Sequence, residues 1–240
     1  MASSHTSREF ESELRELRAN TLAMGARCER SLRLALDAFW KGSHEIAQEV
    51  KALDRHIDRD EMEIDALVLR VLALRQPVAH DLRVLTTALK LVTDLERIGD
   101  EAVNIAERAE ERAGWGPTVG ALDLARSDLR EMSEGAQQLL RDALDAFVDG
   151  EVVRAERVRR GDDAVDALYG KTLVAMTEYM STHPGEIPAA IGVIKVAKYI
   201  ERVADHATNI AEEVIFMVGG EDVRHSLSDE PPAAFSGEKN

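Results

Sequence analysis

The chain is 240 residues long, with 45% apolar residues, only 4% aromatic residues and a formal net charge of −15. The length allows one large domain or two smaller ones, and the aliphatic composition is typical of helices packed on helices. Because an acidic surface repels phosphate backbones, the charge argues against binding to nucleic acid.

Three helices are predicted in the first half of the chain, where apolar residues recur at spacings of three and four. The first covers residues 8–40 and stops at Gly42. The second begins after Ser43, whose hydroxyl can cap it, and continues to about residue 75. We expect Pro77 in the first turn of the third helix, where a missing N–H is tolerated, and the end of this helix near Gly114.

The second half repeats this organisation after the segment GWGP at residues 114–117, which is the expected domain junction. A fourth helix is predicted from about Thr118 to Asp149, ending at Gly150, and a fifth from there to about residue 182. A sixth begins between residues 185 and 188 and ends at Gly219 and Gly220. The tail, residues 221–240, is polar and rich in proline, so we expect it to be disordered.

The two halves are copies of one three-helix unit. The segment LDAF at residues 36–39 is followed by Gly42, and it recurs at 144–147 followed by Gly150. ERIGDEAVNIAE at 96–107 and ERVADHATNIAE at 201–212 are identical at 8 of 12 positions. The fold class is therefore predicted to be all-α, with two tandem three-helix bundles related by pseudo-symmetry. Their expected limits are residues 1–115 and 116–220.

Cellular location is indicated by three features of the sequence. The single cysteine, Cys28, excludes a disulfide within the chain and lies at helical spacing from apolar residues, so we expect a buried structural thiol in a reducing compartment. No stretch approaches the roughly 20 apolar residues that a membrane span requires. The first ten residues contain no apolar run typical of a signal peptide. A cytoplasmic protein is predicted.

Acidic residues are paired four positions apart on four of the predicted helices, so each pair shares one helix face. The pairs are Asp54 with Asp58, Glu96 with Asp100, Asp162 with Asp166, and Glu201 with Asp205. In an antiparallel helix pair, residues equidistant from the turn lie at one level. Positions 58 and 96, like 54 and 100, centre on residue 77, whereas the pairs of the second unit centre between residues 183 and 184. Both centres coincide with predicted turns, so four carboxylates should come level in each unit.

Such clusters are typical of sites for hard or borderline cations. Asn104 and Asn209 lie one helical turn further along the same faces and would add amide oxygens. Oxygen donors of this kind suit magnesium, manganese or iron, and zinc less selectively, and several bridging carboxylates could hold more than one ion. An alternative stays open, in which nearby arginines neutralise the clusters as ordinary salt bridges; these are Arg55, Arg59, Arg97 and Arg202. His56 and His206 point away from the acidic faces, so surface or packing roles are predicted for both.

The segments QPVAHDLR (76–83), DLERIGD (94–100) and YIERVADHATNIAE (199–212) resemble the PhoU family of accessory proteins of the phosphate-specific transport system. The resemblance runs from about residue 8 to residue 220. It implies a cytoplasmic negative regulator of the phosphate-starvation response. The expected partners are the ATPase subunit of the transporter and a sensor histidine kinase, and the resemblance implies that the protein meets the membrane only indirectly, through these partners.

The resemblance also implies that the paired acidic motifs hold multinuclear metal clusters. The usual second motif of the family reads ERIGDH, whereas this chain has ERVADH, with Ala204 in place of glycine. We expect the additional methyl group of Ala204 to shield the second cluster. The first motif keeps its glycine, Gly99.

Two other functions are compatible with a helical, acidic protein. A di-metal carboxylate enzyme in a helical bundle would use Glu-x-x-His on its helices, and the sequence contains no such motif. An accessory role beside a low-affinity phosphate transporter is a closer alternative. A homodimer is also expected for a helical protein of this kind, without an indication of the face involved.

Overall fold

The computed structural model describes residues 2–112, 114–115, 120–220 and 223. This part of the chain forms six long α-helices and contains no β-strand. The helices are α1 (Ala2–Lys41), α2 (His44–Arg75), α3 (Ala79–Arg112), α4 (Gly120–Asp149), α5 (Val152–Thr182) and α6 (Ile187–Gly219), and a short 3-10 turn (Pro184–Glu186) precedes α6. None of these helices is long and apolar enough to cross a lipid bilayer.

Local sequence explains most of the helix ends. Gly42 and Gly150 adopt left-handed backbone conformations, with φ of 64° and 65°, which a glycine reaches without steric cost. Ser43 caps α2 as predicted, since its hydroxyl accepts a hydrogen bond from the amide of Ile46 at 3.3 Å. The predicted end of the fifth helix at Thr182 is also confirmed.

Two predicted helix starts differ from the structure. The prediction for Pro77 is wrong, because α3 begins at Ala79, and the backbone is left-handed at Gln76 before the proline and at Ala79, the first residue of the helix. The first helix begins at Ala2 rather than near Arg8, since no proline or glycine interrupts that stretch. The predicted start at Thr118 and the tail beyond Gly220, apart from Val223, lie outside the described residues.

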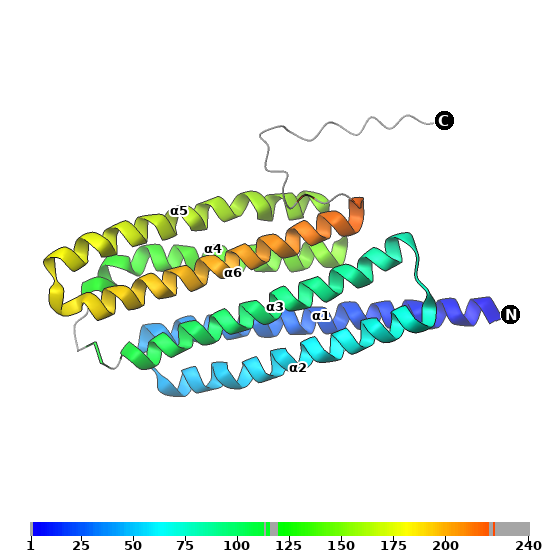
Figure 1. Cartoon of the computed structure of the whole chain (residues 1–240), viewed down its shortest axis with the longest axis horizontal. Helices are drawn as coiled ribbons and strands as arrows, with labels where there is room; N and C mark the ends of the chain where they lie inside the picture. Colours follow the sequence, from blue (N-terminus) through cyan, green and yellow to red (C-terminus); the bar gives the residue numbers. More distant parts are fainter. Residues whose placement is uncertain (1, 113, 116–119, 221–222, 224–240) are drawn as a thin grey trace, which may run out of the picture.

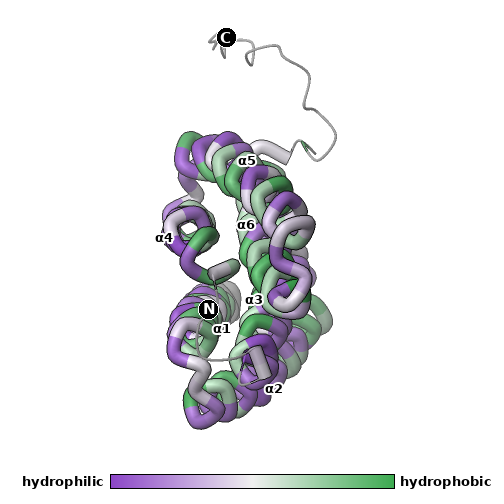
Figure 2. The backbone as a smooth tube through the Cα atoms, turned by 90° about the vertical axis from the view of Figure 1, so that its left-hand side faces the viewer, coloured by the Kyte–Doolittle hydropathy of each residue, from purple (hydrophilic) through white to green (hydrophobic). Residues whose placement is uncertain are grey.

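The predicted fold class is confirmed, because α1–α3 form one bundle and α4–α6 form a second (Figure 1). The bundles meet chiefly along α3 and α6, which run antiparallel, while α1 and α4 touch less. Viewed from the end, α5, α6, α3 and α2 form one layer, and α4 and α1 form the other (Figure 2). The limits predicted for the two domains, 1–115 and 116–220, stay a prediction.

Buried residues of both bundles form a continuous aliphatic core. The repeat-related Phe39 and Phe147 are both buried, as their repeated LDAF segments require. Cys28 is fully buried, and its thiol donates a hydrogen bond to the carbonyl oxygen of Leu95 at 3.2 Å. Burial raises the pKa of this thiol well above its usual range, so the prediction of an unreactive structural thiol is supported.

Candidate functional site

The first acidic cluster lies between α2 and α3. Burial, followed by the charges of Asp58 and Asp100, raises the pKa of Asp54 to about 6. Asp58 is exposed, so the cluster opens to solvent. Gly99 makes room for it, because a β-carbon at this position would lie only 3.1 Å from Asp54 Oδ1. The charges of Asp58 and Asp100 thus act on Asp54, and the metal site expected at these residues stays a prediction.

An arginine shares this first cluster. Arg97 Nε lies 3.4 Å from Glu96 Oε2, and Arg97 Nη1 lies 3.5 Å from Asp100 Oδ2. Burial and then the charge of Asp100 raise the pKa of Glu96, whereas Arg97 acts in the opposite direction. The salt-bridge alternative is thus partly realised in the first unit, where one exposed guanidinium offsets two of the four carboxylates.

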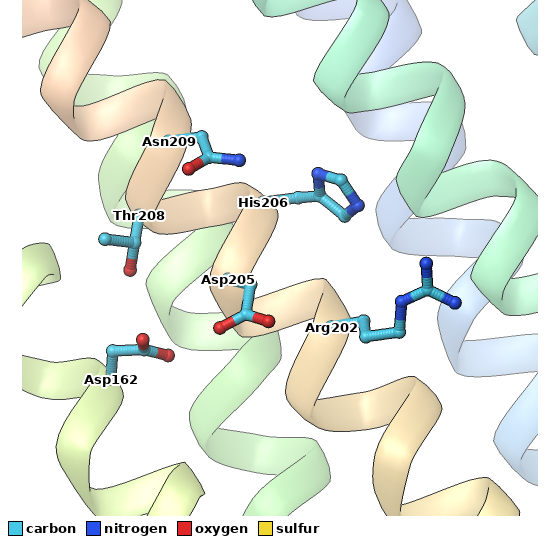
Figure 3. Close-up of a pocket in the computed structure, with 6 residues that line it drawn as sticks. All are labelled: Asp162, Arg202, Asp205, His206, Thr208 and Asn209. Carbon is cyan, nitrogen blue, oxygen red and sulfur yellow. The ribbon is translucent and has the colours of Figure 1, made fainter. Parts of the chain in front are cut away.

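The second acidic cluster is more compact. Asp162, Asp166 and Asp205 each offer a carboxylate oxygen, and these three oxygens lie within 4.8 Å of one another. Figure 3 shows Asp162 of α5 facing Asp205 of α6, with Thr208 on the same side of α6. Burial, followed by the charges of Asp166 and then Asp205, raises the pKa of Asp162 to about 7. The same burial raises the pKa of Asp205.

Two oxygen atoms of this second cluster are buried without a hydrogen-bond partner in the described part of the chain. They are Asp162 Oδ1 and Thr208 Oγ1. A buried acceptor without a partner is costly, so an oxygen-seeking cation beside Asp162 would relieve the cost. Three carboxylates with an orphaned oxygen are a donor set suited to a hard divalent cation. The residues present therefore fit the metal that the sequence predicts.

Neighbouring residues explain why the three aspartates of the second cluster form no ion pair with an arginine in the described part of the chain. Glu201 is buried and turned to Lys198, whose ammonium donates to both of its carboxylate oxygens at 2.6 Å. Arg202, the repeat counterpart of Arg97, reaches across to α3 instead, where its Nη1 lies 3.0 Å from Glu101 Oε1. The methyl group of Ala204 was expected to shield the second cluster, but it does not keep the carboxylates of Asp162 and Asp205 apart.

Asn104 forms a hydrogen bond within α3, whereas Asn209 forms one across the junction of the two bundles. Asn104 Nδ2 donates to Glu101 Oε2 at 3.1 Å, and Asn209 Nδ2 donates to Asp94 Oδ1 at 3.2 Å. His206 Nδ1 lies 2.9 Å from the same oxygen of Asp94, and the surface or packing role expected for this histidine stays a prediction. The role of the two asparagines as metal ligands stays a prediction.

Sequence reasoning missed Asp94, Glu101 and Lys198. Asp94 and Glu101 have no acidic counterpart in the second copy, which carries Tyr199 and His206 at the matching positions. A search for repeated acidic residues therefore passes over them. The antiparallel register of α3 against α6 would have placed both at the contact between the two bundles.

Stability should depend on pH through Asp162. A carboxyl group whose pKa is raised in the folded state destabilises that state when it is ionised, so the metal-free protein should become more stable as pH falls from 8 towards 5. A shift from 3.8 to about 7 corresponds to about 4 kcal/mol, which solvent screening of this partly exposed group reduces to about 1–2 kcal/mol. Urea unfolding in a chelating buffer at several pH values measures this change in the free energy of unfolding.

The control for this pH effect is Asp162→Asn. The variant should be more stable than the unsubstituted protein at pH 8, and the difference between them should shrink as the pH falls through 7. A difference that stays constant between pH 8 and 5 would contradict the raised pKa of Asp162.

Comparison with known proteins extends over both bundles. The model of the PhoU domain matches residues 21–109 and 129–214, once in each bundle. The phosphate-specific transport system accessory protein PhoU homolog of Pseudomonas putida is 38% identical over 221 residues, which are 92% of this chain and 85% of that protein. The phosphate-specific transport system accessory protein PhoU of Escherichia coli is 32% identical over 235 residues, which are 97% of this chain and 95% of that protein.

Solved structures agree with this comparison. The crystal structure of PhoU from Pseudomonas aeruginosa superimposes with a TM-score of 0.82 at 36% identity, covering 88% of this chain and all 100% of the other. The structure of the phosphate transport system regulatory protein PhoU from Streptococcus pneumoniae gives a TM-score of 0.80 at 26% identity, covering 89% and 99% of the two chains.

Proposed function

Because the chain belongs to the PhoU family, we propose that it is an accessory protein of the phosphate-specific transport system and a negative regulator of the phosphate-starvation response. The observation that carries this proposal is the match to relatives of that name over nearly their whole length, in both copies of the repeat. The expected partners are the ATPase subunit of the transporter and the sensor histidine kinase, both reached from the cytoplasm.

The surroundings of the acidic clusters favour an adaptor over an enzyme. A di-metal enzyme in a helical bundle directs its ligands into the bundle core. In this chain Asp58 and Asp166 are exposed, so both clusters open outwards. A cation held between α5 and α6 would neutralise the three aspartates there and fix the two helices relative to each other.

We assign the proposed metal sites to the predicted residues in two groups. Asp162, Asp166 and Asp205 form the second centre, with Glu201 beside it. The first centre comprises Asp54, Asp58, Glu96 and Asp100, with Arg97 as a competitor for the carboxylates. The donors suit magnesium, manganese or iron better than zinc, and each centre has enough carboxylates for more than one ion.

Deleting this chain from its own bacterium tests the proposed regulation. In phosphate-rich medium, the activity of secreted phosphatase should rise several-fold and return to its low level when the intact chain is restored. Expression of the genes for the high-affinity transporter should rise and return in the same way. Unchanged, low phosphatase activity would contradict the regulatory role and direct attention to a low-affinity transporter.

A further inference from the structure

The arginine that follows the first glutamate of each repeated motif has different partners in the two copies. In the first copy, Arg97 forms ion pairs with Glu96 and Asp100 of its own helix, at 3.4 and 3.5 Å. In the second copy, Arg202 forms its ion pair with Glu101 on α3, at 3.0 Å. Figure 3 shows the side chain of Arg202 directed away from the carboxylates of the second cluster and towards α3.

The repeat explains this difference. Glu101 matches His206 in the second copy of the motif, as Arg97 matches Arg202. Because the two bundles are related by pseudo-symmetry, position 206 should face Arg97 as Glu101 faces Arg202. A histidine does not offer a guanidinium the two oxygens of a carboxylate, and His206 Nδ1 already lies 2.9 Å from Asp94. The exchange of a carboxylate for an imidazole thus accounts for the different partners of the two arginines.

We propose that Glu101 is a positioning residue for the metal centre of the other bundle, because it holds Arg202 on α3 and away from the three aspartates. This inference rests on the metal binding proposed above. A guanidinium beside a carboxylate competes with a cation for its oxygens and repels the cation directly. Keeping Arg202 on α3 therefore raises the affinity of the second cluster for a divalent ion.

Arg202 has both the reach and the space to return to this cluster. It precedes Asp205 by three positions on α6, which is the spacing at which Arg97 contacts Asp100. Arg202, Asp162 and Asp205 line one open pocket of about 400 Å³. The side chain of Arg202 is 49% exposed, so a change of its rotamer is enough to bring the guanidinium to Asp205.

Glu101 is well placed to retain Arg202. Its side chain is only 4% exposed, and Asn104 Nδ2 donates a hydrogen bond to Oε2 at 3.1 Å, which fixes the carboxylate. Without Arg202 this carboxylate would be a buried charge lacking its cation, whereas Asp205 is partly exposed to water. Arg202 should therefore stay with Glu101 as long as α3 and α6 are in contact. The affinity of the second cluster for a cation then depends on the contact between the bundles.

Titration with Mn²⁺, followed by the electron paramagnetic resonance signal of the free ion, measures this affinity. Glu101→Gln keeps the size of the side chain but removes the charge that holds Arg202, so the Kd for Mn²⁺ should rise about tenfold. Asp94→Asn is the matched control. It removes one carboxylate from the same junction, where Asp94 contacts His206 and Asn209, and it should change the Kd less than about twofold.

The double variant Glu101→Gln with Arg202→Gln tests whether the arginine carries the effect. It has the net charge of the original protein and no guanidinium to return to Asp205, so its Kd should be close to the original value. Circular dichroism checks that each variant keeps its helices. An unchanged Kd in Glu101→Gln, or a double variant as weak as this single variant, would overturn the proposal and leave the metal centre standing. A lack of Mn²⁺ binding by the original protein would overturn the metal centre and this inference together.

Discussion

Asp162→Asn should abolish the thermal stabilisation that Mn²⁺ gives to this protein. Three carboxylate oxygens of the second cluster lie within 4.8 Å, and Asp162 Oδ1 is buried without a partner in the described residues, so this side chain should be a central ligand. A cation at about one hundred times its Kd stabilises the folded state by about 2.7 kcal/mol. For a chain of this size the Tm should rise by roughly 5–10 °C.

Differential scanning calorimetry with Mn²⁺ and with a chelator measures the effect. Asp163→Asn is the matched control, because Asp163 is its exposed neighbour outside the group of converging carboxylates, and this variant should respond to Mn²⁺ like the original protein. Asp58→Asn distinguishes the two centres. If this variant alone loses the stabilisation by Mn²⁺, the bound ion lies at the first cluster. An equal response to Mn²⁺ in Asp162→Asn and the original protein would disprove a metal ion at the second cluster.

Arg202→Ala should destabilise the contact between the two bundles by about 2–3 kcal/mol, because it leaves a buried carboxylate without its cation. Glu101 is only 4% exposed at its side chain, and Arg202 lies 3.0 Å away on the other bundle. After the substitution Asn104 would be the only hydrogen-bond partner left to Glu101 within the described chain. The measurement is urea unfolding at pH 7.

The repeat supplies a control for this prediction. Arg97 is the counterpart of Arg202 in the first bundle, but it is exposed, and its ion pairs within the described residues are with Glu96 and Asp100 of its own helix. Arg97→Ala should therefore change stability by less than about 1 kcal/mol. The double substitution Arg202→Ala with Glu101→Leu should recover much of the lost stability, since no buried charge is then left unpaired. Equal effects of Arg97→Ala and Arg202→Ala would contradict the importance of the contact.

The sequence predicted the helices and their repeat because these depend on local and periodic features. The spacing of apolar residues marks the buried face of each helix, and Gly42, Ser43 and Gly150 mark three ends through backbone conformation and capping. The start of α3 was missed for a local reason as well. Pro77 tolerates a helix start, but the left-handed residues on either side of it place it in the connection instead.

For the acidic clusters, the sequence could predict which helix face each carboxylate lies on, but not the direction of each side chain. Residues four apart share a face, and equal distances from the turn place the pairs at one level, which identified Asp162, Asp166 and Asp205. The fourth member, Glu201, lies on the same face, yet its carboxylate turns to Lys198. Side-chain direction depends on rotamers and on nearby charges, and neither follows from the spacing alone.

The sequence by itself determined the all-α duplication and the residues that can converge, since helical periodicity and a repeated pattern are properties of the chain. Only the tertiary structure decided how the two copies differ. Arg97 forms ion pairs with Glu96 and Asp100 of the first acidic cluster, whereas Arg202 forms its ion pair with Glu101 on the other bundle. The physical reason is the packing of α3 on α6. It brings together charges about one hundred positions apart, and their pairing stabilises the folded chain only after both helices have formed and met.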